Sequence, residues 1–401
     1  MLKIVKFIGY IFCYLFYPLS FLVPRSKRIL VFGAQRGAFN DNAKYLYLYA
    51  NNHLKPSFRP VWITTKRSTA KMVSALGNEA YWVASPKGFW FALHAKYWFV
   101  NSYTSDILFC LSGGATIVNL WHGIPWKCIE FGIKEGVLAK RYSKEDKWDV
   151  FFHPACFIRP SYVVSGGEMI TKIFADSFRI NSNQCIPSGY PRNSILLQPL
   201  ENVKAHIARY EPQYINDLVE RMAKYDRTFI YMPTWRDSQR NLFTTGMDLE
   251  ALNNLMKEQN ALAIMKPHQN TELPASIVYS NLVFLEGTAD VYCILPFSDV
   301  LITDYSSIMF DYLLMPDKDM ILYQYDYEEY ISERQFNFPL EGNIIGRKVT
   351  SFEELLECIR KKDYVVSTSE RKIFLSKFWG DTMNKDVCAN ILKQLNITCE
   401  A

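Results

Sequence analysis

The stretch RILVFGAQRGAFNDNAKYLYLYA, residues 28–50, sets a pattern that recurs along the chain. Its opening apolar run closes on Gly33, and an unbroken apolar run bounded by glycine is typical of a strand that is buried on both faces. Asn40 or Asp41 is placed to cap the helix that follows. A buried strand that leads into a helix is the first half of a βαβ unit, so the stretch predicts an α/β protein with a parallel sheet.

Short apolar runs alternate with polar, helix-like stretches through most of the remaining sequence. The alternation pauses between residues 190 and 225, a proline-containing region without a long apolar run, and then restarts. Strands that alternate with helices at this spacing predict two doubly wound, Rossmann-type domains. The expected strands are 28–34, 58–65, 80–84, 96–101, 115–121 and 162–166 in the first half, and 227–235, 261–268, 281–287, 300–304 and 319–326 in the second.

Length and composition agree with two folded domains. A chain of 401 residues exceeds one ordinary domain, and a content of 49% apolar and 21% charged residues excludes a disordered protein. We expect an N-terminal segment over residues 1–24, an N-terminal domain over 25–205 and a C-terminal domain over 206–401, with a cleft between the domains. Ligands of open parallel sheets bind beyond the carboxyl ends of the strands, so reactive residues are expected there.

Charge and cysteine content narrow the classes of partner. A net charge of +5 favours anionic partners, such as phosphorylated substrates or acidic lipid headgroups, but no concentrated basic stripe points to nucleic acid. The nine cysteines form no CxxC pair and their number is odd. Reduced thiols in a cytosolic protein are therefore expected, rather than a disulfide framework or a zinc site.

The N-terminal segment is apolar and aromatic from Phe7 to Val23 and is flanked on both sides by Lys and Arg. No small-residue cleavage site follows, which argues against a signal peptide. The stretch is short for a membrane span and contains Pro18, and positive charge on both flanks gives no clear orientation. We expect a helix that lies on the cytoplasmic face of the cell membrane, which makes the protein peripheral. The alternative is packing of this helix on the first domain.

The strand expected at 115–121 ends in His122, Gly123, Ile124 and Pro125. A histidine at this edge can exchange a proton near neutral pH, and Gly123 lets a substrate approach the backbone. His122 is therefore a candidate general base. The alternative is a hydrogen-bonded structural histidine.

Two strand ends in the second half carry donors suited to phosphate oxygens. Thr234, Arg236 and Asp237 follow the strand expected at 227–235, and the guanidinium of Arg236 offers a planar fork. Lys266 and His268 end the strand expected at 261–268 and suit a pyrophosphate. The alternatives are a surface ion pair between Arg236 and Asp237, and a solvated turn around Lys266.

The stretch LITDYSSIMFDYLL, residues 301–314, predicts a strand that ends at Asp304 and a helix that begins at about Ser306. Ser306 and Ser307 would offer hydroxyl groups beside the free backbone N–H groups of the helix, a natural site for phosphate. Asp311 lies about one helical turn further on. Ser306 can also simply cap the helix.

No metal or cofactor is expected in the chemical step. The acidic sequence DKD at residues 317–319 resembles a metal-binding pair, but it lies between an expected helix and an expected strand, where a solvated turn is favoured. The sequence contains no HxxxH, DxDxDG or P-loop motif.

The motifs WHGIP, YMPTWRDS, MKPH and TDYSSIMFDYLL, in this order, resemble those of the CDP-glycerol glycerophosphotransferase family of teichoic-acid and capsule synthesis. FNDNAKYLYLYA near the start and SGYPRNS at 188–194 are similar too. The resemblance runs from about residue 28 to the tail. It implies a GT-B-like fold with an acceptor-side N-terminal domain and a CDP-donor-binding C-terminal domain.

The resemblance also implies an activity, namely transfer of glycerol phosphate or another polyol phosphate from a CDP-activated donor to a hydroxyl of a lipid-linked saccharide, with release of CMP. His122 matches the family's proposed general base. His268, Ser306 and Ser307 match positions that hold the donor pyrophosphate, with Arg236 nearby, and Asp311 matches a further acidic site position.

Two positions depart from the family's pattern, since Ile124 stands where Thr is common and Gln269 where Pro is common. A GT-B glycosyltransferase that uses a nucleotide sugar, and a non-catalytic membrane-associated binding protein on the same scaffold, are the rival functions. Release of CMP from CDP-polyols, rather than transfer from UDP-sugars or binding alone, separates them.

Overall fold

The computed structural model describes residues 2–234, 247–266, 278–384 and 386–398. The chain forms two compact units, of which the first comprises residues 1–194 and 379–401 and the second residues 195–378. Each unit contains one sheet whose neighbouring strands are all parallel. The expected α/β architecture with two parallel sheets is therefore confirmed.

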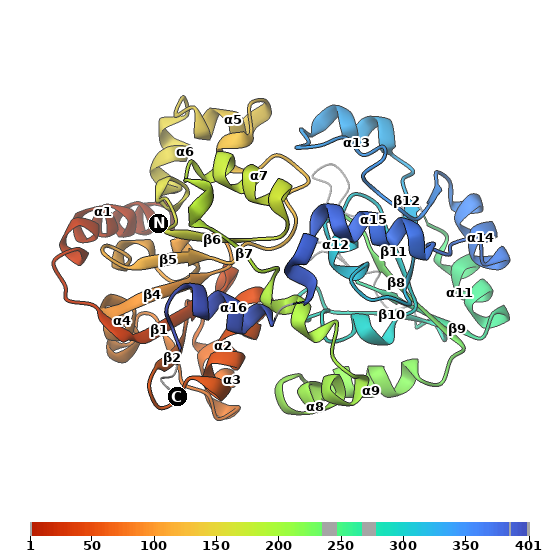
Figure 1. Cartoon of the computed structure of the whole chain (residues 1–401), viewed down its shortest axis with the longest axis horizontal. Helices are drawn as coiled ribbons and strands as arrows, with labels where there is room; N and C mark the ends of the chain where they lie inside the picture. Colours follow the sequence, from red (N-terminus) through yellow and green to blue (C-terminus); the bar gives the residue numbers. More distant parts are fainter. Residues whose placement is uncertain (1, 235–246, 267–277, 385, 399–401) are drawn as a thin grey trace. The chain divides into compact units, whose positions relative to one another are not determined.

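The first unit is built on a seven-stranded sheet with the order β3-β2-β1-β4-β5-β6-β7 (Figure 1). Its strands are β1 (Ser26–Gly33), β2 (Arg59–Thr64), β3 (Ala80–Trp82), β4 (Ala95–Val100), β5 (Thr116–Asn119), β6 (Tyr162–Ser165) and β7 (Cys185–Pro187). Its helices are α1 (Leu2–Ser20), α2 (Asp41–His53), α3 (Arg67–Ala75), α4 (Pro86–His94), α5 (Gly136–Tyr142), α6 (Lys147–Phe152), α7 (Glu168–Phe178) and α16 (Val387–Gln394).

The central strand β1 has an unbroken apolar run because helices cover both of its faces. On one face, Ile29 and Val31 belong to a core cluster that also includes side chains of α4. On the other face, the ring of Phe32 lies 5.4 Å from that of Tyr47 in α2. Alternate side chains of one strand thus enter two different cores, as is typical of a doubly wound sheet.

The second unit is built on a six-stranded sheet with the order β10-β9-β8-β11-β12-β13. Its strands are β8 (Arg227–Met232), β9 (Ala261–Met265), β10 (Leu282–Phe284), β11 (Val300–Thr303), β12 (Asp319–Tyr323) and β13 (Arg347–Val349). Its helices are α8 (Leu200–Tyr210), α9 (Gln213–Met222), α11 (Leu249–Glu258), α12 (Ile308–Tyr312), α13 (Tyr327–Glu333), α14 (Phe352–Lys361) and α15 (Thr368–Phe378).

All the expected strands are present, but the short edge strands β7 and β13 did not stand out in the sequence. Each spans three residues, and one contains proline while the other is mostly basic. The helix expected from Ser306 is also shorter than predicted, since α12 contains five residues and begins at Ile308. Apolar periodicity cannot mark elements this short.

The C-terminal segment corrects the expected domain boundaries. The boundary lies between residues 194 and 195 rather than 205 and 206, and residues 379–401 belong to the first unit rather than to the C-terminal domain. Trp379 is almost fully buried, with its ring 5.6 Å from that of Tyr190. The apolar face of α16 is buried as well, and the sequence does not reveal which of two sheets such a helix will cover.

Helix α1 packs one face on the first unit and exposes the other. One face of α1 packs against the core cluster that includes side chains of α4, through Tyr10, Cys13, Phe16 and Tyr17. On this face the helix packs on the first domain, which was the alternative expectation. The opposite face carries an apolar stripe at helical spacing, with exposed fractions of 59% at Ile8, 59% at Phe12, 71% at Leu15, 55% at Leu19 and 80% at Leu22. In the described part of the chain, no helix has both the length and the apolar character needed to cross a membrane.

Replacing Trp379 by Ala tests the attachment of the C-terminal segment. The change removes a buried ring and leaves a cavity, so we expect the free energy of unfolding to fall by about 3–5 kcal/mol. Urea unfolding followed by far-UV circular dichroism measures the loss. The matched control is Ile373→Ala in α15, where the side chain is 71% exposed and the expected change is within about 0.5 kcal/mol. Equal effects of the two substitutions would show that residues 379–398 are not held by the Trp379 ring.

Candidate active site

His122 lies just beyond the carboxyl end of β5, in a turn with an unusual backbone. Trp121 and Gly123 both have positive φ, 51° and 132° respectively. The second value is readily available only to glycine, so Gly123 is required by the turn as well as by any close approach of a substrate. The neighbouring Trp121 and Ile124 are buried whereas the His122 side chain is exposed, so the imidazole is available to a ligand.

The imidazole of His122 is oriented by residues that follow β4. Its Nδ1 atom lies 3.2 Å from the Ser102 hydroxyl, and Ser102 in turn accepts a hydrogen bond from the Gln35 amide. The nearby backbone of Asn101 raises the pKa of the ring, which favours its protonated form. These contacts are the kind that fix the tautomer and the direction of a histidine side chain.

Opposing effects act on the proton affinity of the imidazole. Desolvation by the surrounding protein atoms lowers the pKa of His122 from its ordinary value of 6.5, the Asp41 carboxylate raises it, and the Arg192 guanidinium lowers it again. Because the side chain keeps an exposed surface, water tempers this lowering. The net result is a histidine that stays neutral, and able to accept a proton, at and somewhat below neutral pH.

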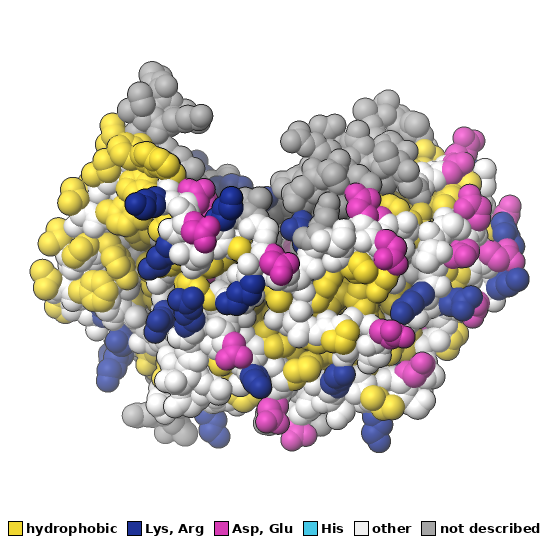
Figure 2. Space-filling view, turned by 90° about the horizontal axis from the view of Figure 1, so that it is seen from above, with side chains coloured by type: hydrophobic (Ala, Val, Ile, Leu, Met, Phe, Trp, Pro, Cys, Tyr) yellow, Lys and Arg dark blue, Asp and Glu magenta, His cyan; other side chains and the backbone are white. Residues whose placement is uncertain are grey.

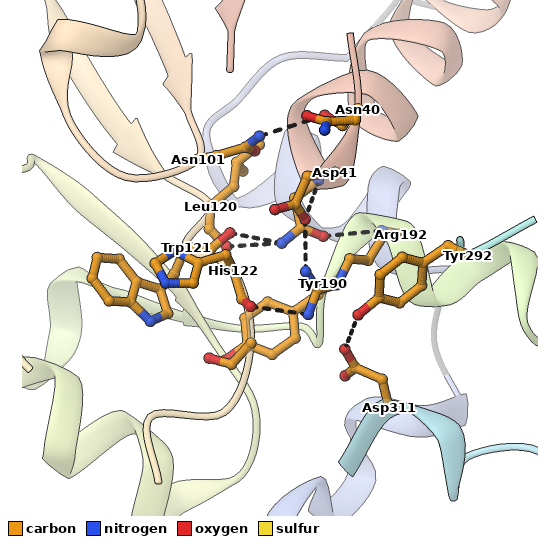
Figure 3. A network of polar contacts seen from close by, with 12 residues as sticks. Asn40, Asp41, Asn101, Leu120, Trp121, His122, Tyr190, Arg192, Tyr292 and Asp311 are labelled. Carbon is orange, nitrogen blue, oxygen red and sulfur yellow. Dashed lines mark hydrogen bonds and ion pairs between the residues drawn. The ribbon is translucent and has the colours of Figure 1, made fainter. Parts of the chain in front are cut away.

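The backbone of the His122 turn is anchored by the segment that precedes the second unit (Figure 3). Arg192 donates from Nη2 to the carbonyl oxygen of His122 at 3.0 Å and from Nη1 to Asp41 at 2.7 Å. The Tyr190 hydroxyl donates to the carbonyl oxygen of Gly123 at 3.0 Å. The guanidinium and phenol therefore hold two successive carbonyl groups of the turn, and both side chains are buried.

Asn42, at the start of α2, completes this anchor. Its side-chain nitrogen donates to the carbonyl oxygen of Trp121 at 2.8 Å, and its side-chain oxygen accepts from the backbone nitrogen of Arg192 at 3.1 Å. Asn40 occupies the N-cap position of α2 but its side chain makes no capping bond, while Asp41 has a positive φ of 60° and turns toward Arg192. These residues serve the His122 turn rather than only the helix end.

These residues lie in motifs that stand out in the sequence, but the sequence does not reveal their roles. Asp41 and Asn42 lie in FNDN, and Tyr190 and Arg192 lie in SGYPRNS. Their partners are about 70 to 150 positions away in the chain, and only the folded sheet brings them together. Ser102 was not singled out at all, since one serine after an apolar run carries no distinctive signal.

In the second unit, the expected donor-binding residues follow three adjacent parallel strands. Thr234 follows β8, Lys266 follows β9, and Ser306 and Ser307 follow β11. Because these strands are neighbours and parallel, the residues share the carboxyl edge of one sheet. The structure thus gathers Thr234, Lys266, Ser306 and Ser307 at one edge.

Lys266 has a side-chain ammonium whose pKa is strongly lowered by its surroundings. Its ammonium donates to the carbonyl oxygen of Gly287 at 2.7 Å, and burial lowers the pKa of Lys266 to about 8 while Asp290 opposes the lowering. A buried cation at a strand end with a lowered pKa is typical of a functional position.

Asp304 and Asp311 have roles inside the second unit. Both carboxylates are fully buried. Asp304 accepts the backbone N–H of Thr234 at 2.9 Å, which ties the end of β11 to the end of β8. Asp311 accepts a hydrogen bond from the Tyr292 hydroxyl at 2.6 Å, which is a contact inside the protein.

Ser306 lies beside the start of α12, where its hydroxyl accepts the backbone N–H of Ile308 at 3.4 Å. Ser307 occupies the N-cap position without a side-chain capping bond. The capping role foreseen for Ser306 is therefore observed in weak form, and the hydroxyl of Ser307 makes no such bond to the helix.

Three sequence-predicted residues, Arg236, Asp237 and His268, and also Gln269, lie outside the described residues. Within the described ranges, no group of three or more His, Cys, Asp or Glu side chains could hold a metal ion. In the DKD sequence, Asp319 begins β12 and accepts the backbone N–H of Val366 at 3.0 Å, so this residue serves the fold.

Comparison with known proteins gives concordant matches. The family model described as CDP-glycerol:poly(glycerophosphate) glycerophosphotransferase matches residues 15–392. The chain is 26% identical to the teichoic acid glycerol-phosphate transferase of Staphylococcus aureus (strain NCTC 8325 / PS 47) over 398 residues, covering 92% of this chain and 94% of that protein. It is also 26% identical to the teichoic acid poly(glycerol phosphate) polymerase of Bacillus spizizenii (strain ATCC 23059 / NRRL B-14472 / W23), covering 91% and 92%.

Among solved structures, the fold is similar to that of the wall teichoic acid polymerase TagF. The TM-score is 0.73 at 20% sequence identity, covering 98% of this chain and 97% of the matched chain. At this identity the likeness concerns the fold, and it agrees with the GT-B-like architecture of two parallel sheets that was expected from the sequence.

Replacing Asp41 by Asn tests the electrostatic link between Asp41 and the imidazole. The change removes the carboxylate that raises the pKa of His122, while desolvation and the Arg192 charge remain. We therefore expect the pKa of His122 to fall, so that the ring stays neutral to lower pH. NMR titration of the histidine ring protons measures this, with the His122 signal assigned by its loss in His122→Gln.

The control for this titration is Asp176→Asn, which removes an exposed carboxylate of α7 and should leave the midpoint of His122 in place. An unchanged or higher midpoint in Asp41→Asn would contradict the geometry described for this site.

Proposed function

The chain belongs to the CDP-glycerol:poly(glycerophosphate) glycerophosphotransferase family, and on this premise we propose that it transfers glycerol phosphate, or another polyol phosphate, from a CDP-activated donor to a hydroxyl group of a membrane-associated glycan, releasing CMP. The resemblance of the sequence motifs to this family is thus confirmed, and the chain is an enzyme of the transferase class. The proposed acceptor is a prenyl-linked saccharide in the synthesis of teichoic acid or a capsule-like polymer.

The observation that carries the proposal is the state of His122. Its side chain is exposed, its ring is oriented by Ser102 and its backbone is fixed by Arg192. A structural histidine would bury its ring and spend both nitrogen atoms on protein partners. The contact with Ser102 uses Nδ1, and we propose that Nε2 faces the substrate.

We assign the proton of the neutral ring to Nδ1, on the side of the Ser102 hydroxyl. Nε2 then removes the proton of the acceptor hydroxyl. The hydroxyl oxygen attacks the phosphorus atom that bears the glycerol, a new P–O bond forms, and the P–O bond to the bridging oxygen of CMP breaks. CMP leaves with that oxygen and its electron pair, and the imidazolium later releases the proton to water.

Negative charge grows on the departing CMP, and fixed donors stabilise such charge. We propose that Lys266, Ser306 and Ser307 contact the donor phosphates, together with Arg236 and His268. The lowered pKa of Lys266, about 8, keeps its ammonium largely protonated at pH 7, because a group is charged below its pKa. Asp304, Thr234 and Asp311 support this edge through the internal bonds described above.

The exposed apolar stripe of α1 is the proposed contact with the cytoplasmic face of the cell membrane. Its large apolar side chains recur at helical spacing from Ile8 to Leu22, and such a stripe can enter the boundary between headgroups and acyl chains. Trp148 of α6 is 68% exposed beside the α1 residue Phe7, with ring centroids 6.4 Å apart, and tryptophan favours membrane interfaces. A peripheral position would bring the enzyme to a lipid-linked acceptor.

Replacing His122 by Ala tests the assignment of the general base. Loss of the base should lower the rate of CMP release from CDP-glycerol by roughly 10²- to 10⁴-fold, with little change in donor binding. The assay uses a prenyl-linked saccharide acceptor, with CDP-ribitol and UDP-sugars offered in parallel. The length of the product is read by mass spectrometry.

The matched control for this assay is Lys172→Gln, which removes an exposed cation of α7 and should retain most of the activity. Near-wild-type turnover by folded His122→Ala would rule out the base. Transfer from UDP-sugars, without use of any CDP-polyol, would instead support a glycosyltransferase.

A further inference from the structure

A cavity of about 600 Å³ lies in the first unit between α1 and the segment that contains α6. It is lined by aromatic side chains from both, including Tyr14, Tyr17, Phe21, Phe109 and Phe157. A volume of this size is within the range of pockets that enclose small ligands. The cavity reaches Ala115 and Ile117 at the start of β5, whereas His122 follows the other end of that strand, so the cavity is separate from the candidate active site.

The charged residues that line the cavity are all positive. It contains two cationic residues, Lys144 and Arg159, and no carboxylate. Both cations are exposed, and the Lys144 ammonium lies 5.4 Å from the centre of the Phe157 ring. In the part of the chain that the structure describes, neither forms an ion pair with a carboxylate. An apolar cavity with two available cations at its solvent side is complementary to a hydrocarbon chain attached to an anionic group.

The cavity is continuous with the exposed stripe of α1. Phe21 lines the cavity and is also 56% exposed, and it adjoins Leu22 and Leu19 in that stripe. Figure 2 shows hydrophobic side chains gathered on the side of the view where Figure 1 places α1, with Lys and Arg side chains beside them. A hydrocarbon chain can therefore pass from the stripe into the cavity along apolar surface.

We propose that this cavity binds one fatty acyl chain of an anionic bilayer phospholipid, with the lipid phosphate held by Lys144 and Arg159. The proposal rests on the membrane contact proposed for α1 but not on the catalytic assignment. A bilayer phospholipid is favoured over the acceptor lipid, because the acceptor must present its hydroxyl group at His122, beyond the opposite end of β5. The α1 stripe alone would insert into any bilayer surface. Binding of an anionic lipid in the cavity would make the membrane contact selective for anionic membranes.

The test is calorimetric titration of the full chain with monomeric palmitoyl lysophosphatidylglycerol, below its critical micelle concentration. We expect saturable binding of one molecule per chain. Ala115→Phe places a ring in the cavity and should weaken binding at least about tenfold, because it displaces several buried methylene groups. Val150→Phe fills the cavity from another wall and guards against a folding defect in the first variant, with circular dichroism as the check.

The headgroup contact is tested by the double variant Lys144→Gln and Arg159→Gln, which should weaken binding roughly tenfold. Lysophosphatidylcholine should bind more weakly than the anionic lipid to the wild type. The matched controls are Lys147→Gln, an exposed cation of α6 that does not line the cavity, and Leu15→Ala on the exposed stripe. Both should bind the monomeric lipid as the wild type does.

Three results would overturn the proposal. Binding that neither cavity-filling variant weakens would mean that lipid touches only the surface of α1. An equal loss of lysolipid affinity in the double variant and in Lys147→Gln would contradict the proposed contact of Lys144 and Arg159 with the lipid phosphate. Displacement of the lysolipid by a polyprenyl phosphate at lower concentration would assign the cavity to the acceptor chain. CMP release with a soluble acceptor should be unchanged in Ala115→Phe, so failure of the proposed catalysis would be seen separately from failure of lipid binding.

Discussion

Arg192 joins three segments that are distant in the chain, namely its own, the start of α2 and the turn that contains His122. Its guanidinium bonds to the carbonyl oxygen of His122 and to the carboxylate of Asp41, and the backbone nitrogen of the same residue bonds to Asn42. The turn contains a non-glycine residue with positive φ, Trp121, and such a conformation persists only where its surroundings hold it. Placement of the imidazole therefore depends on this buried cation more than on any property of the strand that precedes it.

The same principle, in which polar groups are buried to fix strand ends, recurs in the second unit. Asp304 uses its carboxylate on the backbone of Thr234, and a buried carboxylate that accepts backbone N–H groups is stable only with those bonds in place. The hydroxyls of Ser306 and Ser307 are then presented at an edge whose geometry is already set. In this unit the buried carboxylates of Asp304 and Asp311 bond to other protein groups, whereas the side chain of His122 in the first unit is exposed.

Much of the fold follows from the sequence because buried parallel strands such as β1 need long apolar runs, and these are visible without a partner. The three-residue strands β7 and β13 were missed because they are too short for any periodicity. The placement of residues 379–398 was missed because the amphipathic pattern of α16 records a buried face and not the surface that buries it. His122 was recognisable from its position after β5. Ser102, Tyr190 and Arg192 were not, since hydrogen-bond partners across the sheet leave no local mark.

The sequence of the apolar N-terminal helix α1 did not distinguish between contact with a membrane and packing on the first domain. Its composition predicted a membrane surface, with domain packing as the alternative, and the structure shows one apolar face packed and one exposed. Both interpretations arose from the same residues because the helix is apolar all round, and only the three-dimensional contacts divide them into two faces.

The role of His122 as general base is tested most directly by the pH dependence of kcat/KM for CMP release, which reports the pKa of the free enzyme, in the wild type and in His122→Asn. The wild-type kcat/KM should fall on the acid side with an inflection below pH 6.5, because desolvation by nearby protein atoms lowers the pKa of His122 from that ordinary value. In His122→Asn the residual rate should lack that inflection. An acid inflection that persists unchanged in the variant would show that another group accepts the proton, and would contradict the central assignment.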